Sequence, residues 1–328
     1  MGATIEQAEC LEWLRRQPDD SVDLVMCSPP YEAARLYGEV QFKLRGQDWV
    51  DWAVERYLEC VRISRGLVAW VVEGQTRQFR WSATPALLMA DLHRAGVKLR
   101  KPPIFHRVGI CGSGGPDWWR NDYEFCVCST KGKLPWSDNT ATGHPPKWAP
   151  GGEMSHRLSS GARCNKWGAG RNNTVGPRKP DGSRAGNSGS PRKNWGVGGR
   201  MPETRNGDAV RVKAQTRRKA NGERPMDGLY TEPAIANPGN VIKCKVGGGM
   251  MGDNLAHENE APYPEKLVES FVLCFCPPGG VVCDPFIGSG TTAAVALRHN
   301  RNFVGCDIRQ SQVELTRRRI AEVQPLLM

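Results

Sequence analysis

A glycine-rich segment near the C-terminal end of the chain, DPFIGSGTT (284–292), has the composition of a ligand-binding turn. Such a turn between a strand and a helix presents backbone N–H groups to a ligand, and an acidic residue ending the next strand holds ribose hydroxyls. Gly288 and Gly290 supply the turn, and Asp307 follows 17 residues after Gly290. A carboxylate at Asp284 would repel a pyrophosphate, whereas it suits a cationic amino acid end. The segment therefore favours S-adenosylmethionine over NAD as the cofactor.

The segment SPPY (28–31) follows an apolar run that ends at Cys27, and ligand sites of open α/β sheets lie at the carboxyl ends of strands. Because prolines lack N–H groups and fix the backbone, the Ser28 side chain and the Pro29 carbonyl can accept hydrogen bonds from an exocyclic amine. Tyr31 offers a flat face on which a flipped base can stack. Standing alone, the segment could simply end a strand, so its interpretation depends on the glycine-rich turn.

Both segments need strands that end at one edge of a sheet, and the surrounding sequence supplies such strands. Apolar runs suited to strands alternate with runs of helical spacing, both in the first 130 residues and after residue 261. This alternation predicts a doubly wound α/β sheet. The expected strands are 22–27, 67–72, 98–106, 123–129, 281–283 and 303–306, and the expected helices are 9–16, 48–64, 84–96, 261–276 and about 292–299.

The charge of the chain is concentrated in one segment. The 328 residues carry a net charge of +11, and residues 131–224 hold 20 Lys/Arg against 6 Asp/Glu. This part is rich in Gly, Arg, Asn, Ser and Pro, yet it contains four tryptophans, which a purely disordered segment usually lacks. It predicts a basic, loop-rich insert over 131–240, with a short basic helix near 208–220, that binds a polyanion. A nucleic acid is the commonest such partner, and a solvated loop is the alternative.

Other classes of protein lack support in the sequence. No run approaches the ~20 apolar residues that span a bilayer, and the N-terminal residues lack the pattern of a signal peptide, so a cytoplasmic protein without membrane contact is expected. The 12 cysteines form no Cys-x-x-Cys pair and are interpreted as buried, reduced thiols. The six histidines have no convincing metal-ligand neighbours, so no metal is expected.

Together and in this order, the two motifs resemble those of the amino-methylating DNA methyltransferases, in the permuted group whose catalytic motif precedes the cofactor motif. The resemblance covers 1–130 and 241–322 and extends to VDLVMCSPPY (22–31), to Glu124, and to HENEAPYP (257–264). It implies a Rossmann-like, doubly wound, mixed seven-stranded sheet. It also implies three segments: 1–130 as the catalytic half, 131–240 as the target-recognition insert, and 241–328 as the half that binds S-adenosylmethionine.

The resemblance assigns roles to residues of both motifs. The residues expected to hold the target amine and base are Ser28, Pro29, Pro30 and Tyr31. Those expected around the cofactor are Asp284, Phe286, Gly288, Gly290, Thr291 and Thr292, with Asp307 at its ribose. The family usually has Gly-Asp where this chain has Ala8-Glu9, so Glu9 is expected to replace that Asp near the cofactor adenine.

The chemistry explains why these residue types suffice. An exocyclic amine is a poor nucleophile because its lone pair is delocalised into the ring. Acceptors at Ser28 and Pro29 that draw its N–H groups out of the ring plane direct the lone pair toward the sulfonium methyl, so positioning contributes most. Methylation at ring carbon 5 would need a cysteine that attacks the base, normally presented as Pro-Cys, and Cys27 lacks this context.

The expected function is methyl transfer to the N4 amine of a cytosine flipped out of double-stranded DNA. In the resembled family SPPY more often accompanies cytosine N4 and DPPY adenine N6, with exceptions, so adenine N6 is the first alternative. Further alternatives are a catalytically inactive nucleic-acid-binding protein of this fold, an RNA substrate, and a nicotinamide-dependent oxidoreductase suggested by Gly288-Ser289-Gly290. The recognition sequence and the oligomeric state are not encoded in a readable pattern.

Overall fold

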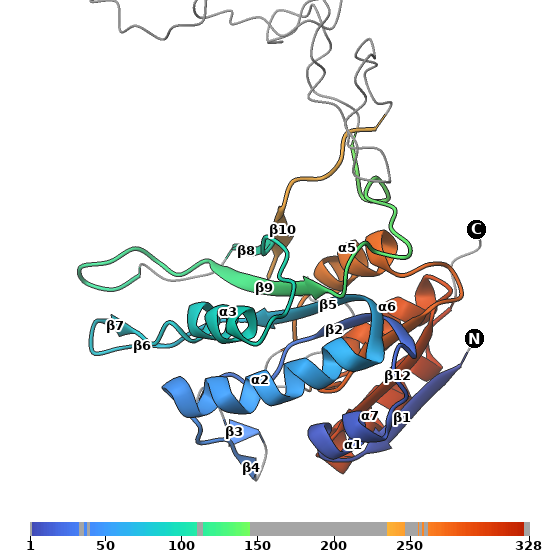
Figure 1. Ribbon diagram of the computed structural model, residues 1–328, viewed down its shortest axis with the longest axis horizontal. Coiled ribbons are helices and arrows are strands. Elements are labelled where there is room, and N and C mark those ends of the chain that lie inside the picture. Colours follow the sequence, from blue (N-terminus) through green and yellow to red (C-terminus); the bar gives the residue numbers. More distant parts are fainter. Residues whose placement is uncertain are drawn as a thin grey trace, which may run out of the picture. The chain divides into compact units, whose positions relative to one another are not determined.

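The computed structural model (Figure 1) describes residues 2–32, 36–37, 40–109, 114–144, 235–246, 255, 258 and 262–324. By its internal contacts, the part formed by 1–143 and 237–328 is one compact unit. All helices and strands named below belong to this unit. Most of the expected insert, including the basic helix near 208–220, lies outside the described residues, so its role stays a prediction.

Eight strands form the main sheet, in the order β1-β12-β11-β2-β5-β9-β8-β10. All neighbours are parallel except β9, which is antiparallel to both β5 and β8. The expectation of a mixed, doubly wound sheet is therefore confirmed. The bounds are β1 (Ala3–Gln7), β2 (Val22–Cys27), β5 (Ser64–Val72), β8 (Ile104–Val108), β9 (Tyr123–Thr130), β10 (Val241–Lys245), β11 (Val281–Asp284) and β12 (Asn302–Asp307).

The sheet has eight strands where seven were expected, and β10 is one that the pattern did not reveal. It is an edge strand that pairs in parallel with β8, with Val241 opposite Ile104. Its side chains are mostly exposed except Cys244, and they include Lys243 and Lys245. An edge strand with lysines lacks the long apolar run of a buried strand, which explains why it escaped the sequence pattern.

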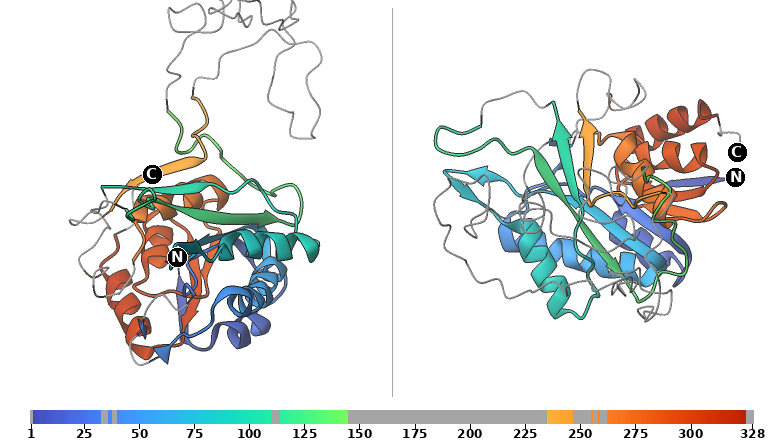
Figure 2. Two further views of the ribbon diagram at one scale, coloured as in Figure 1. Left: turned by 90° about the vertical axis from the view of Figure 1, so that its left-hand side faces the viewer. Right: turned by 90° about the horizontal axis from the view of Figure 1, so that it is seen from above.

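Helices cover both faces of the sheet (Figure 2). One apolar cluster joins the sheet to α1 (Cys10–Arg16), α2 (Gly46–Ile63) and α3 (Thr84–Arg94). The other joins it to α5 (Glu265–Phe275), α6 (Thr291–Arg298) and α7 (Gln310–Ala321). Because both faces are covered, the central strand β2 is buried throughout, which is why it is apolar except for Asp23, whose carboxylate pairs with Arg65.

Two short hairpins complete the described elements. The strands β3 (Leu36–Tyr37) and β4 (Val40–Gln41) pair with each other soon after SPPY. The strands β6 (Thr76–Arg77) and β7 (Arg80–Trp81) form a second antiparallel pair between β5 and α3. Both hairpins leave the sheet near the ends of strands that carry site residues.

The strand order brings the two motifs together. The connection after β11 runs through α6 on one face, whereas the connection after β2 runs through α2 on the opposite face. Since β11 and β2 are neighbours, the chain diverges between their carboxyl ends, and ligands of open α/β sheets bind at such a divergence. SPPY and the glycine-rich turn begin at these two strand ends.

The ten described cysteines are buried and free of disulfides, in agreement with their interpretation as packed thiols. Burial raises the pKa of the Cys27 thiol well above its ordinary value, with the neighbouring Asp284 carboxylate adding to the effect. A neutral, buried thiol is a poor nucleophile. Among the helices of the described part of the chain, none is both long and apolar enough to span a bilayer.

Candidate active site

Asp284 ends β11 as a buried carboxylate with three donors around it. Oδ1 accepts a hydrogen bond from the Phe286 N–H at 2.9 Å. Oδ2 accepts from Thr292 Oγ1 at 2.6 Å and from Tyr263 Oη at 3.1 Å. Burial raises the pKa of Asp284 to about 6, although these hydrogen bonds oppose the shift. A carboxylate offers about four lone-pair sites, so this group retains an acceptor for a cationic ligand.

Thr292 ties the glycine-rich turn to the strand that carries SPPY. Besides its bond to Asp284, its hydroxyl lies 3.4 Å from the Met26 carbonyl on β2 and contacts Tyr263 Oη. Tyr263 precedes α5 and belongs to the HENEAPYP segment, but the sequence alone predicted no role for it. His257 of the same motif lies outside the described residues.

The turn itself depends on its glycines. Gly288 and Gly290 have φ angles of +49° and +77°, in the left-handed region that side chains disfavour. A Cβ on Gly290 would lie 2.7 Å from Thr316 Cγ2 of α7. Thr291 and Thr292, the first two residues of α6, are buried immediately after this turn. The N-terminus of α6 can thus sit close to the sheet edge.

Asp307 ends β12 and binds the turn from the next strand. Its Oδ2 accepts from the Gly288 N–H at 3.0 Å, and its Oδ1 accepts from the Arg309 N–H at 3.0 Å. The adjacent end of β1 is held by a bond from the Ala8 N–H to the Asp307 carbonyl at 3.0 Å. Asp307 therefore lies at the carboxyl edge, as expected of a ribose-binding acid, and also fixes the glycine turn.

Glu9 follows β1 at the same edge, but its carboxylate already has partners. Oε2 accepts from the N–H groups of Leu11 and Glu12 and so caps α1, and Oε1 forms an ion pair with Arg56 at 2.7 Å. Burial raises the pKa of Glu9, but these interactions outweigh burial and lower it. The Arg56 guanidinium lies 4.5 Å from the centre of the Trp52 ring. Glu9 thus has a structural role that the sequence did not reveal.

Phe286 packs in an aromatic cluster beneath the turn. Its ring centroid lies 5.9 Å from that of Trp52 and 5.7 Å from that of Trp70. Trp52 belongs to α2 and Trp70 to β5, so the cluster joins the glycine-rich turn to the half of the sheet that follows SPPY. This packing adds to the hydrogen bonds by which the N–H groups of Phe286 and Gly288 already fix the turn.

SPPY is held by a chain of hydrogen bonds that reaches β9. Ser28 Oγ lies 3.3 Å from Tyr31 Oη and 3.3 Å from the Val71 carbonyl. Tyr31 Oη donates to Glu124 Oε2 at 2.6 Å, and Arg107 lies 3.2 Å from the other oxygen of that carboxylate. The structure therefore links Ser28 and Tyr31 to the carboxylate of Glu124, 93 positions after Tyr31. The resemblance included Glu124 but implied no role for it.

The two prolines differ in the use of their carbonyls. The Pro30 carbonyl accepts from Trp49 Nε1 at 2.9 Å, so it anchors the motif to α2. Among the residues that the structure describes, no donor is assigned to the Pro29 carbonyl. Pro29 is thus the better acceptor for a substrate amine.

Two further carboxylates near SPPY were missed by the sequence analysis. The buried Glu32 accepts from the Gly46 N–H at 3.0 Å and the Gln75 N–H at 2.9 Å, so it ties SPPY to α2 and to the hairpin after β5. Glu73 accepts from the Gly74 N–H and from Trp81 Nε1, and burial raises its pKa. Nothing in the local pattern distinguished these residues from ordinary loop acids.

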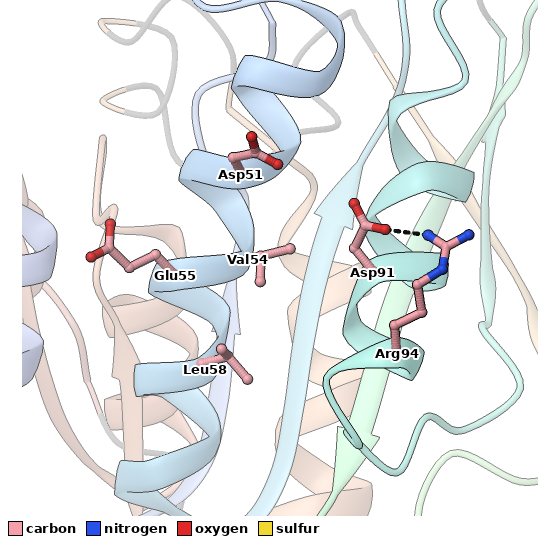
Figure 3. A pocket seen from close by; sticks show the side chains of 6 residues that line it. All are labelled: Asp51, Val54, Glu55, Leu58, Asp91 and Arg94. Atoms are coloured by element: carbon pink, nitrogen blue, oxygen red, sulfur yellow. Dashed lines mark hydrogen bonds and ion pairs between the residues drawn. The ribbon is translucent and has the colours of Figure 1, made fainter.

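A hollow between α2 and α3 lies apart from this edge (Figure 3). Its lining residues are Asp51, Val54, Glu55, Leu58, Asp91 and Arg94. Arg94 pairs with Asp91, as the dashed line shows, and none of the expected site residues contributes to the wall. The hollow therefore plays no part in the site described here.

Comparison with known families decides what kind of site this is. The family model for DNA methylases of the N6/N4 type matches residues 22–318. The chain belongs to this DNA methylase family. The match begins at β2, includes both motifs and ends within α7.

Curated relatives of this DNA methylase align over nearly the whole chain. It is 24% identical to the type II methyltransferase M.BglII of Bacillus subtilis, over 95% of this chain and 67% of the relative. It is 25% identical to the orphan methyltransferase M.BamHII of Bacillus amyloliquefaciens, over 92% and 89%. It is 23% identical to the DNA adenine methyltransferase YhdJ of Escherichia coli (strain K12), over 97% and 82%.

Solved structures share its fold. The PvuII DNA methyltransferase (cytosine-N4-specific) superposes with a TM-score of 0.59 at 15% identity, covering 97% of this chain and 86% of that one. TTHA0409 of Thermus thermophilus, in complex with S-adenosyl-L-methionine, gives a TM-score of 0.51 at 19% identity, covering 98% and 95%. At such identities the likeness concerns the fold alone.

The family implies S-adenosylmethionine as the cofactor, and the residues present fit it. A buried carboxylate with a spare acceptor suits the cationic amino end, and the carboxyl edge carries a second carboxylate, Asp307, on the neighbouring strand. Among the residues that the structure describes, no group of three or more His, Cys, Asp or Glu is placed to hold a metal ion.

Proposed function

We propose that this DNA methylase methylates the N4 amine of a cytosine flipped out of double-stranded DNA, in the crevice between the carboxyl ends of β11 and β2. The observation that carries the proposal is the state of Ser28. Its single proton has acceptors within the protein, at Tyr31 and Val71, so its lone pairs are left for a substrate amine. The Pro29 carbonyl supplies the second acceptor.

We assign the cofactor contacts by the same geometry. Asp284 binds the amino end of the cofactor, the backbone around Gly288 and Gly290 approaches its methionine part, and Asp307 binds its ribose. Phe286, Thr291 and Thr292 support this turn, as their packing and hydrogen bonds indicate. Glu9 lies at the same edge. It would contact the adenine through a carboxylate lone pair that neither the cap of α1 nor the ion pair with Arg56 uses.

The chain's own residues then contribute positioning. S-adenosylmethionine supplies an electrophilic methyl group when bound. Ser28 and Pro29 accept the two N–H groups of the target amine, which turns its lone pair out of the conjugated ring, and Tyr31 stacks on the base. The amine loses its proton after the methyl group is attached, so no strong base is required beside SPPY.

Cytosine is preferred to adenine because Ser28 is a neutral acceptor, as in the SPPY motifs that in the resembled family more often accompany cytosine N4. The second candidate is adenine N6, because the Escherichia coli relative that aligns over 97% of this chain is named a DNA adenine methyltransferase. Both amines would be held by the same acceptors.

The DNA partner is assigned to the basic part of the chain. We propose that 131–240 is the target-recognition insert between a catalytic half (1–130) and a cofactor-binding half (241–328). Its excess of Lys and Arg suits a phosphate backbone, and its tryptophans suit contacts with bases.

One assay tests function and site together. The full-length protein is incubated with unmethylated DNA and labelled S-adenosylmethionine, and the nucleosides are identified by mass spectrometry. We expect N4-methylcytosine, lost in Ser28→Ala and Tyr31→Ala and retained in Ser270→Ala, a matched change on α5 whose hydroxyl bonds to the Lys266 carbonyl. N6-methyladenine would overturn the base assignment, and absence of methyl transfer despite cofactor binding would overturn the proposed function.

A further inference from the structure

The hydrogen-bond chain through SPPY has a fixed direction. A carboxylate can only accept, so the 2.6 Å contact between Tyr31 Oη and Glu124 Oε2 uses the tyrosine proton. Ser28 must then be the donor in its 3.3 Å contact with Tyr31 Oη, and its other neighbour, the Val71 carbonyl at 3.3 Å, can only accept as well. The Ser28 proton is therefore directed into the protein by both of its partners.

Glu124 is itself held in place. Arg107 of β8 lies 3.2 Å from its Oε1, and Glu124 pairs with Phe105 across the two antiparallel strands β9 and β8. The Glu124 side chain is only 12% exposed. Its position is thus set by the sheet and not by SPPY, so it can impose its direction on Tyr31.

We propose that Glu124 is a positioning and specificity-determining residue, which acts through Tyr31 to make Ser28 an obligate hydrogen-bond acceptor. The inference rests on the proposed function, in which Ser28 touches the target base. An obligate acceptor can hold an amine but repels a carbonyl at the same ring position. Glu124 would thus exclude uracil or thymine where cytosine is accepted, and hypoxanthine where adenine is accepted.

The energetic reason is the cost of facing two acceptors toward each other. A carbonyl oxygen in place of the amine would leave its own lone pairs, those of Ser28 and those of the Pro29 carbonyl without donors in a closed site. If Ser28 were free to turn, it would donate to that carbonyl and recover one bond. While Glu124 holds the Tyr31 proton, Ser28 can turn only by giving up its contacts with both Tyr31 and the Val71 carbonyl. When Tyr31 can donate to Ser28, or lacks its hydroxyl, only the Val71 contact is lost, so the turn costs less.

The test compares two duplexes that differ at the target base, where a carbonyl replaces the amine and the adjacent ring nitrogen gains a proton. This second change is the same for every variant, so it cancels when the affinity ratios of the variants are compared. The duplex that the protein methylates is prepared with the target base intact, or with uracil for cytosine or hypoxanthine for adenine, and affinity is measured by fluorescence anisotropy with S-adenosylhomocysteine present. For Glu124→Gln we expect the ratio of the two affinities to fall by about tenfold, because an amide can either accept or donate. The loss should arise from tighter binding of the carbonyl duplex.

Tyr31→Phe is the second variant, since it keeps the ring but removes the hydroxyl that transmits the direction. We expect the same fall in the ratio. The control has to be a Glu→Gln change away from the site, which excludes Glu73 because it follows β5 near SPPY and Glu124. Glu314→Gln takes that place: Glu314 lies on the exposed side of α7 and accepts a hydrogen bond from Gln310. Glu314→Gln should retain the wild-type ratio.

The outcomes separate this inference from the proposed function. If Glu124→Gln and Tyr31→Phe bind cofactor normally and retain the wild-type ratio, the inference is wrong, whatever the activity. If the wild-type protein methylates no DNA, or Ser28→Ala leaves both the activity and the ratio unchanged, the proposed function fails first. If Glu124→Gln does not fold, the Tyr31→Phe ratio decides.

Discussion

Thr292 donates a 2.6 Å hydrogen bond to the buried Asp284 carboxylate, which places the first turn of α6 against the tip of β11. The same hydroxyl lies 3.4 Å from the Met26 carbonyl on β2. One side chain thereby connects the cofactor motif to the strand that carries the catalytic motif. The proposed transfer of a methyl group requires that these two strand ends keep a constant separation.

Asp284→Asn is expected to weaken S-adenosylmethionine binding by about ten- to a hundredfold, because a charge-assisted hydrogen bond to the cationic amino end is lost. Titration calorimetry measures the change in Kd. Asp51→Asn, on the exposed side of α2, is the matched control and should bind normally. An unchanged affinity in Asp284→Asn would show that another group binds the amino end.

The affinity for S-adenosylmethionine should rise as the pH increases from about 5 to 7, because the pKa of Asp284 in the folded protein is about 6 and only its ionised form attracts a cation. Since this pKa is raised above the ordinary value of 3.8, the native state binds the proton more tightly than the unfolded state. The contribution of Asp284 to the free energy of unfolding therefore declines as the pH rises from 3.8 to about 6. In Asp284→Asn both dependences should disappear, and a persistent binding profile would point to a different titrating group.

Gly290→Ala should lower the free energy of unfolding more than Gly279→Ala. Both glycines have φ angles near +75°, but a Cβ on Gly279 meets nothing within 4 Å, whereas one on Gly290 would meet Thr316 at 2.7 Å. Left-handed strain costs about 1 kcal/mol at either position, and displacement of α7 adds about 1–3 kcal/mol at Gly290. Chemical denaturation of both variants measures the difference, and equal losses would contradict the close packing of α6 on α7.

Glu9→Ala should lower the free energy of unfolding by about 2–4 kcal/mol, since it removes the N-cap of α1 and leaves the nearly buried Arg56 without its 2.7 Å partner. Glu12→Ala, in the same helical turn but exposed, is the control and should cost little. Thermal denaturation and calorimetry with S-adenosylmethionine are compared. A loss of cofactor affinity in Glu9→Ala without loss of stability would favour an adenine contact over the cap.

Local patterns predicted much of the sheet. The strand Val22–Cys27 has the expected bounds, and α2 (Gly46–Ile63) lies within two residues of the expected 48–64. These elements are long, apolar and periodic, so their own residues determine their structure. The helix expected over 84–96 ends at Arg94, and Ala95 leads from it to the left-handed Gly96.

The sequence by itself determined most of the buried strands and helices, the two motifs and hence the family resemblance, because glycine turns, proline pairs and apolar runs act over a few neighbouring residues. It did not reveal β1, β10 or α7. Only the tertiary structure showed three side-chain contacts of the site. They are the hydrogen bonds from Tyr31 to Glu124 and from Tyr263 to Asp284, and the ion pair between Arg56 and Glu9. These partners come from different strands and helices, and their distances depend on how the sheet orders its strands. The direction of the hydrogen bonds at Ser28 is therefore a property of the fold and not of SPPY.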